Sequence, residues 1–110
     1  MKRFQQLIAD AKAGLAPWEP LPAERIPAIG GALTAADIAD IVASLDDLAR
    51  EKSQVPTWDG DTCDDIARTQ QLFARLVVSV PPPLHSHLDA VLQGARAETR
   101  EWVALARRGE

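Results

Sequence analysis

Three groups of side chains have the residue types that catalysis or metal binding uses. They are the histidine pair His85 and His87, the single thiol of Cys63, and the acidic run at residues 59–65. Zinc sites need more ligands than two histidines, and a helical histidine pair usually has i, i+4 spacing. Calcium needs many oxygen ligands at defined positions, and this acidic run lacks the final Glu of a calcium loop. We therefore expect no metal site and no cofactor.

The cysteine and the two histidines could also form a nucleophile and base pair. Cys63 stands in no recognisable nucleophile motif, although a pairing with His85 or His87 remains open at this point. Gly30-Gly31 precedes a predicted helix, but neither a Walker nor a dinucleotide-binding pattern surrounds it. The sequence therefore predicts a protein that is not an enzyme, with no catalytic residue to name.

Composition and charge limit the classes of partner and the compartment that we expect. The formal net charge is −4 and the pI about 5.1, so little affinity for a phosphate backbone is expected, and we predict no nucleic-acid partner. The sequence contains no apolar run long enough to predict a membrane span or a signal peptide. A single cysteine is typical of a reducing compartment, which favours the cytoplasm. The excess of Arg over Lys and the abundance of Ala suit a GC-rich bacterial genome.

The elements that position these residues are helices. Apolar residues recur at three- and four-residue spacing in four segments, which predicts four amphipathic helices. The clearest start is Thr34, where Asp37 follows at the spacing of a capping box, and Thr62 with Asp65 repeats that pattern. Pro81-Pro82-Pro83 should separate the last two helices. The predicted helices span about 2–14, 34–52, 62–79 and 84–107.

Residues 15–33 are the least regular part of the chain. Four prolines and two glycines argue against a continuous helix there. Trp18, Leu21, Ile26 and Ile29 are nevertheless apolar, which a solvated linker would not need. We predict an extended Pro-rich strap whose apolar side chains lie across the helices. The expected fold is an all-α single domain over residues 1–110, a small four-helix up-and-down bundle with this strap between its first two helices.

One stretch of sequence is similar to a known family. Residues 26–39, from Ile26-Pro27 to Asp37-Ile38-Ala39, resemble the approach to the last helix of small c-type cytochromes. The haem-ligating methionine of that family corresponds to Ile26 here, and the Cys-x-x-Cys-His attachment motif is absent. We therefore expect no haem.

These observations favour an interaction protein. The apolar faces of the four helices and the apolar residues of the strap together have more surface than a small core can bury. This predicts an apolar face that stays exposed and free for a partner. We expect a non-enzymatic, regulatory or protein-binding bundle that associates with a protein partner or with itself, as a homodimer. Two alternatives stay open, an accessory subunit of a larger enzyme complex and a small-ligand binder with a pocket under the strap. The candidate partner-binding residues are Trp18, Leu21, Ile26, Ile29, Trp58 and Trp102.

Overall fold

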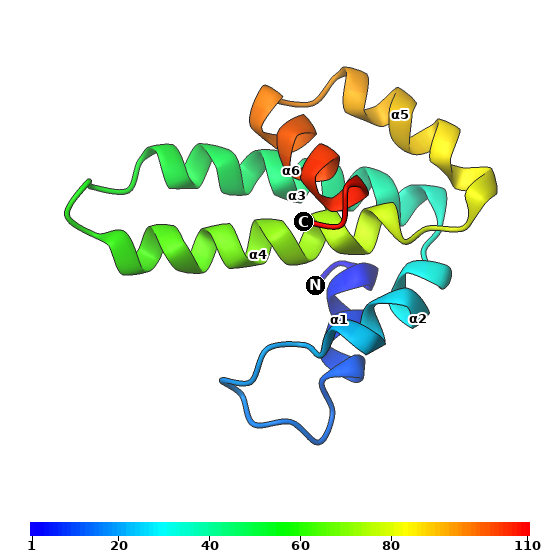
Figure 1. Cartoon of the computed structure of the whole chain (residues 1–110), viewed down its shortest axis with the longest axis horizontal. Helices are drawn as coiled ribbons and strands as arrows, with labels where there is room; N and C mark the ends of the chain where they lie inside the picture. Colours follow the sequence, from blue (N-terminus) through cyan, green and yellow to red (C-terminus); the bar gives the residue numbers. More distant parts are fainter.

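The computed structural model describes residues 1–110, and every regular element in it is helical (Figure 1). This confirms the all-α class. Six helices are present where the sequence predicted four, and two short 3₁₀ turns at Ala23–Arg25 and Pro82–Leu84 accompany them. The helices are α1 (Arg3–Ala11), α2 (Ile26–Gly31), α3 (Ala35–Ser53), α4 (Gly60–Val78), α5 (His85–Gln93) and α6 (Ala97–Arg107). None of them combines the length and the apolar character that a membrane crossing requires.

The antiparallel hairpin of α3 and α4 is the centre of the molecule. α3 begins as expected, because the Thr34 hydroxyl accepts a hydrogen bond from the Asp37 amide at 3.3 Å and the Asp37 carboxylate accepts one from the Thr34 amide at 2.8 Å. α4 begins at Gly60, two residues before the predicted start. Its cap is Asp59, whose carboxylate accepts hydrogen bonds from the Thr62 amide and hydroxyl, so Thr62 is not the cap.

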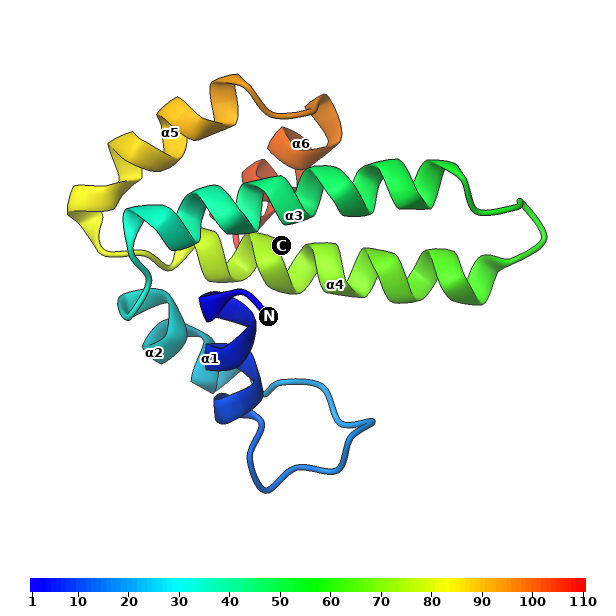
Figure 2. The same cartoon turned by 180° about the vertical axis from the view of Figure 1, so that it is seen from behind.

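The remaining helices cover the hairpin on two sides. α1 and α2 lie beside one end of it, while α5 and α6 cross over another side (Figures 1 and 2). Phe4 from α1 is fully buried and meets Phe73 of α4 edge to face, with ring centroids 5.2 Å apart. Ile38, Ile41 and Leu45 line the buried side of α3. Most of the buried side chains from all six helices therefore meet in one apolar cluster.

The strap predicted over residues 15–33 is only partly extended. Its second half forms α2, in which Pro27 occupies the first turn, where a proline is tolerated. The helix forms because this turn buries Ile26 and Ile29 against the hairpin. The first half of the strap continues the end of the predicted first helix, residues 12–14, as one loop over residues 12–22. This loop projects away from the helices (Figures 1 and 2), and we call it the Trp18 loop.

The helix predicted over residues 84–107 is two helices. α5 ends at Gln93, and α6 begins at Ala97 in a new direction. The break is stabilised from outside the segment. Asp46 of α3 accepts hydrogen bonds from the Arg96 amide at 3.1 Å and from the Thr99 hydroxyl at 2.6 Å, and so holds the start of α6. The four-helix up-and-down bundle is therefore corrected to a central hairpin flanked by four shorter helices.

Candidate partner-binding surface

The three tryptophans lie in very different environments. Trp18, on the Trp18 loop, and Trp58, between α3 and α4, are each 84% exposed. Trp102 of α6 is half-buried, with the Lys52 ammonium 5.7 Å from its ring. An exposed indole leaves a large apolar surface in water, so Trp18 and Trp58 are the strongest candidates for contact with another molecule.

The other predicted residues divide between core and surface. Ile26 and Ile29 are only 7% and 5% exposed and belong to the apolar cluster, so they support the surface from beneath. Leu21 is half-buried and lines a groove between the Trp18 loop and α4. The structure therefore brings Trp18, Leu21 and Ile26 to one site and leaves Ile29 in the interior.

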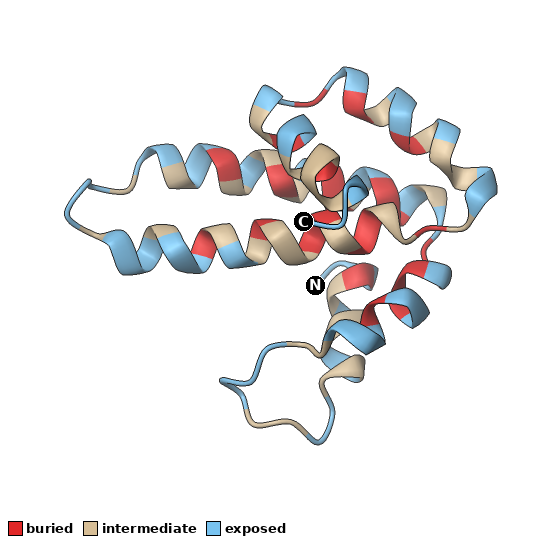
Figure 3. Ribbon diagram, in the orientation of Figure 1, coloured by how far each residue is buried: buried red, intermediate tan, exposed pale blue.

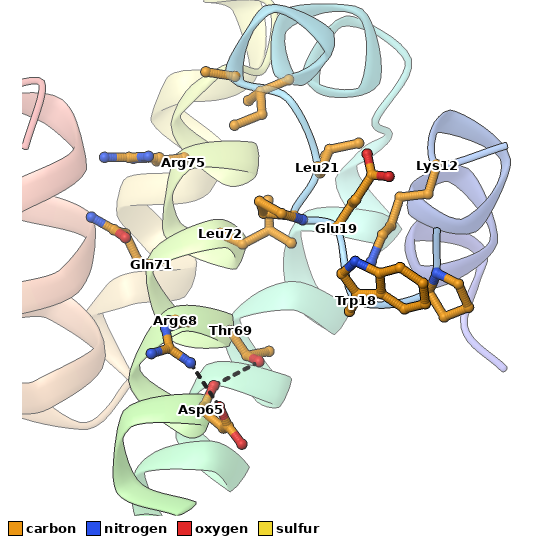
Figure 4. Close-up of a pocket in the computed structure, with 14 residues that line it drawn as sticks. Lys12, Trp18, Glu19, Leu21, Asp65, Arg68, Thr69, Gln71, Leu72 and Arg75 are labelled. Atoms are coloured by element: carbon orange, nitrogen blue, oxygen red, sulfur yellow. Dashed lines mark hydrogen bonds and ion pairs between the residues drawn. The ribbon is translucent and has the colours of Figure 1, made fainter. Parts of the chain in front are cut away.

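A groove of about 540 Å³ separates the Trp18 loop from α4 (Figure 4). On the loop side it is lined by Trp18, Glu19 and Leu21, and on the helix side by Leu72 and Arg75 among others. Trp18 and Lys12 lie close together at one edge, as the close-up shows. Apolar side chains such as Trp18, Leu21 and Leu72 alternate in its lining with charged and polar ones, which suits contact with a partner that carries both kinds of side chain. We call it the α4 groove.

The outer face of α4 continues past the groove toward α6. A second hollow, of about 260 Å³, is lined by Asp64, Ala67, Arg68, Gln71 and Trp102. Arg68 and Gln71 line both hollows. The outer face of α4 therefore has the Trp18 loop on one side and the Trp102 region of α6 on the other. We call these two flanking segments the two banks.

Charged side chains are sorted along this outer face. Asp61 and Asp64 lie in the first two turns of α4, and Arg68 and Arg75 lie in the later turns. Arg68 is paired with Asp65 at 2.8 Å within the helix, whereas Asp61, Asp64 and Arg75 make no ion pair in the chain. The sequence-based argument missed these residues, although the seven-residue spacing of Asp61, Arg68 and Arg75 was visible.

A polar network fixes Trp102 and the α6 bank. The Lys52 ammonium contacts the Glu98 carboxylate at 2.7 Å and donates to the Gln70 side-chain oxygen at 3.0 Å, while the Gln70 amide donates to Glu98 at 2.6 Å. Burial raises the pKa of Glu98, but hydrogen bonds from Lys52 and Gln70, the charge of Lys52 and a hydrogen bond from Trp102 together lower it below its usual value. The network therefore joins α3, α4 and α6 through an ionised carboxylate.

The end of the α3–α4 hairpin stands apart from the other helices. Residues 54–59 and the adjoining helix ends are mostly exposed, as the burial colouring shows (Figure 3), and Trp58 lies there. In both ribbon views this end extends beyond α1, α2, α5 and α6. It is therefore accessible to a second molecule from several directions.

The residues with catalytic side chains are not assembled. Cys63 lies in the first turn of α4 and His85 starts α5 beyond the other end of α4, so most of the length of that helix separates them. The His85 ring nitrogen lies 3.1 Å from the Val80 carbonyl oxygen, which fixes the ring locally. The Cys–His pair left open by the sequence is therefore not formed. No three side chains of His, Cys, Asp or Glu converge in a way that could hold a metal ion.

Comparisons with known proteins give no family for this chain. No protein-family model matches it, and no significant match was found among curated proteins or solved structures.

Proposed function

We propose that this protein is a non-enzymatic interaction module that associates with itself through the α4 groove and the tryptophans beside it. The observation that carries the proposal is the 84% exposure of Trp18 next to a groove lined by both apolar and charged side chains. Tryptophan is enriched among the residues that contribute most to protein interfaces, and its burial by a partner removes a large apolar surface from water.

The rim of the groove supports a protein as the occupant. Lys12, Arg68 and Arg75 stand around it together with Glu19 and Asp65. A mixed charged rim around an apolar centre is the usual composition of a protein interface. The chain itself carries another exposed tryptophan, Trp58, beside acidic residues, so a second copy offers the complementary features.

Self-association is tested by measuring the solution mass of the wild type by light scattering from low to high micromolar concentration. We expect a dimer that dissociates on dilution. Trp18→Ala should raise the dimer dissociation constant by about 30-fold, the effect of losing about 1 kcal/mol at each of the two Trp18 contacts of the dimer. Gln93→Ala, an exposed substitution on α5, serves as the matched control and should leave the dissociation constant unchanged.

Circular dichroism and thermal unfolding of the same variants separate binding from folding. Because Trp18 is exposed, its replacement should change the free energy of unfolding of the monomer by less than about 0.5 kcal/mol. A wild type that stays monomeric at every concentration contradicts self-association. A dimer unaffected by Trp18→Ala contradicts the assigned surface.

A small-ligand binder is the second candidate, because the α4 groove has the volume of a small-molecule site. A ligand that binds only the folded chain must raise its melting temperature. The ligand hypothesis therefore requires a rise in melting temperature with a small molecule that Trp18→Ala abolishes.

A further inference from the structure

The outer face of α4 carries three charged residues at equal spacing. Asp61, Arg68 and Arg75 are seven residues apart in the sequence. Seven residues are nearly two helical turns, so the three side chains form a line along the helix with steps of about 10 Å. The buried residues Ile66, Phe73 and Val77 lie on the opposite side of the same helix. The line therefore lies on the side of α4 away from the core, with Asp61 and Arg68 exposed and Arg75 half-buried.

The sign of the charge reverses along this line. The first half carries Asp61 and Asp64 and the second half carries Arg75. Arg68 lies at the middle, paired with Asp65 of its own chain. Two copies of such a helix repel when they run parallel, because like charges meet. When they run antiparallel, the acidic half of each copy faces the basic half of the other. The face is therefore complementary to itself in one orientation.

The surroundings of the two halves also differ in a complementary way. The acidic half starts at the α3–α4 connection, which contains Trp58. This end of the hairpin projects beyond the other helices (Figures 1 and 2). The Trp18 loop flanks α4 from Asp65 to Arg75, and Trp102 on α6 flanks it from Asp64 to Gln71. A projecting end of one copy can therefore enter between the two banks of another.

We propose that the occupant of the α4 groove is a second copy of this chain, with the two α4 helices antiparallel about a two-fold axis at Arg68. This arrangement brings Asp61 of each copy opposite Arg75 of the other. The two Arg68 side chains meet at the axis, where each is neutralised by its own Asp65 at 2.8 Å. The Trp18 loop of each copy, which flanks α4 from Asp65 to Arg75, then lies beside the first half of α4 of the second copy. The inference rests on the self-association proposed above and adds the surface, the orientation and the pairing.

The two-fold arrangement fixes the number of copies in the assembly. Because both halves of the contact lie on one face of one helix, forming the first contact also forms the second, and no binding face is left open. The assembly closes as a dimer and does not grow into a filament. Its charge pairs lie at an accessible surface, so its dissociation constant should rise with salt concentration.

The test reverses charges singly and in combination. Asp61→Arg and Arg75→Glu each place like charges together twice in a dimer, so each variant alone should have a dissociation constant raised by about tenfold or more. In an equimolar mixture of the two variants, every Asp61–Arg75 contact again joins opposite charges. The mixture should therefore form a heterodimer, detected by light scattering and by labelling one variant with a fluorophore. The double variant should dimerise like the wild type.

Two exposed positions away from α4 give matched controls. Asp10→Arg and Arg96→Glu make the same reversals of charge on α1 and before α6, and they should leave the dissociation constant unchanged. Rescue in the mixture cannot arise from misfolding, because two damaged chains would not restore each other. Circular dichroism of each variant checks this independently.

Failure of this inference and failure of the proposed function give different results. A wild-type dimer that is insensitive to both reversals, or whose mixture is not rescued, overturns the antiparallel pairing but leaves self-association intact. A species larger than a dimer also overturns it. A wild type that remains monomeric overturns both.

Discussion

Gly30 lies where α2 meets the C-terminal end of α4. A Cβ atom at this position would lie 2.7 Å from the Ser79 carbonyl oxygen and closer still to the Ser79 Cβ. Both neighbours belong to or adjoin the backbone, so they cannot rotate away as a flexible side chain would. The absence of a side chain at Gly30 is therefore what lets α2 approach α4 closely enough to bury Ile26 and Ile29.

Gly30→Ala should destabilise the protein by about 1–3 kcal/mol, because the added methyl group forces the two helices apart. The neighbouring Gly31 gives the control, since a Cβ there meets nothing within 4 Å. Gly31→Ala should be neutral or stabilising by up to about 1 kcal/mol, because alanine has less freedom in the unfolded chain. Urea unfolding of both variants measures the difference, and equal stabilities would contradict the close approach.

At the scale of elements, the end of α5 and the start of α6 illustrate how one helix is held by another. Arg96, the residue before α6, makes no capping hydrogen bond with its side chain. Asp46 of α3 supplies the acceptor instead, and its carboxylate also receives the hydroxyl of Thr99, which is only 1% exposed. The position of α6 on the hairpin therefore depends on a residue fifty positions earlier in the chain.

Asp46→Ala should lower the free energy of unfolding by about 1–3 kcal/mol, because it leaves the buried Thr99 hydroxyl without a partner. Asp47→Ala provides the control on the adjacent residue. Asp47 makes an exposed ion pair with Arg50 at 2.8 Å, and its loss should cost less than about 1 kcal/mol. Urea unfolding of the two variants measures the two losses of stability. A larger loss for Asp47→Ala than for Asp46→Ala would argue against the role given to Asp46.

At the scale of the whole molecule, the network around Glu98 couples stability to pH. Its members Lys52, Gln70 and Glu98 come from α3, α4 and α6, so the network forms only when these helices are packed together. Burial raises the pKa of Glu98, but hydrogen bonds and the charge of Lys52 stabilise the carboxylate, so the pKa in the folded protein lies below the ordinary value of 4.5. The ionised carboxylate therefore stabilises the fold above about pH 4.5, and this contribution is lost as the pH falls through the folded pKa.

Glu98→Gln should reduce stability at neutral pH and have no effect once the wild-type carboxylate is protonated. Since Glu98 is 36% exposed, solvent screening keeps the expected loss below about 1 kcal/mol. Glu101→Gln, at an exposed position without an ion pair, is the control and should show no such pH dependence. Free energies of unfolding measured from neutral to acidic pH provide the check. A difference that persists unchanged at low pH would contradict the assigned ionisation.

Local patterns in the sequence were sufficient for the helices whose signals are local. The Thr34–Asp37 capping box and the apolar periodicity of residues 34–52 predicted α3 nearly to its ends, because capping and amphipathicity depend on residues within one helix. The start of α4 was misplaced because Asp59 and Thr62 are both competent caps, and the choice between them depends on the turn before the helix. Exposed Trp18 could not be told from a packed Trp18, since the same indole suits either environment.

The all-α class, the α3–α4 hairpin and the separation of α4 from α5 at the prolines all follow from local sequence patterns. Tertiary structure alone decided that residues 26–31 form a helix, that the last helix breaks at Gly94, and that Asp61, Arg68 and Arg75 line an outer face between two banks. The physical reason is the range of the interactions. Helix propensity and capping act over a few residues, whereas the Gly30–Ser79 approach and the Asp46 cap of α6 join positions about fifty residues apart and exist only after packing.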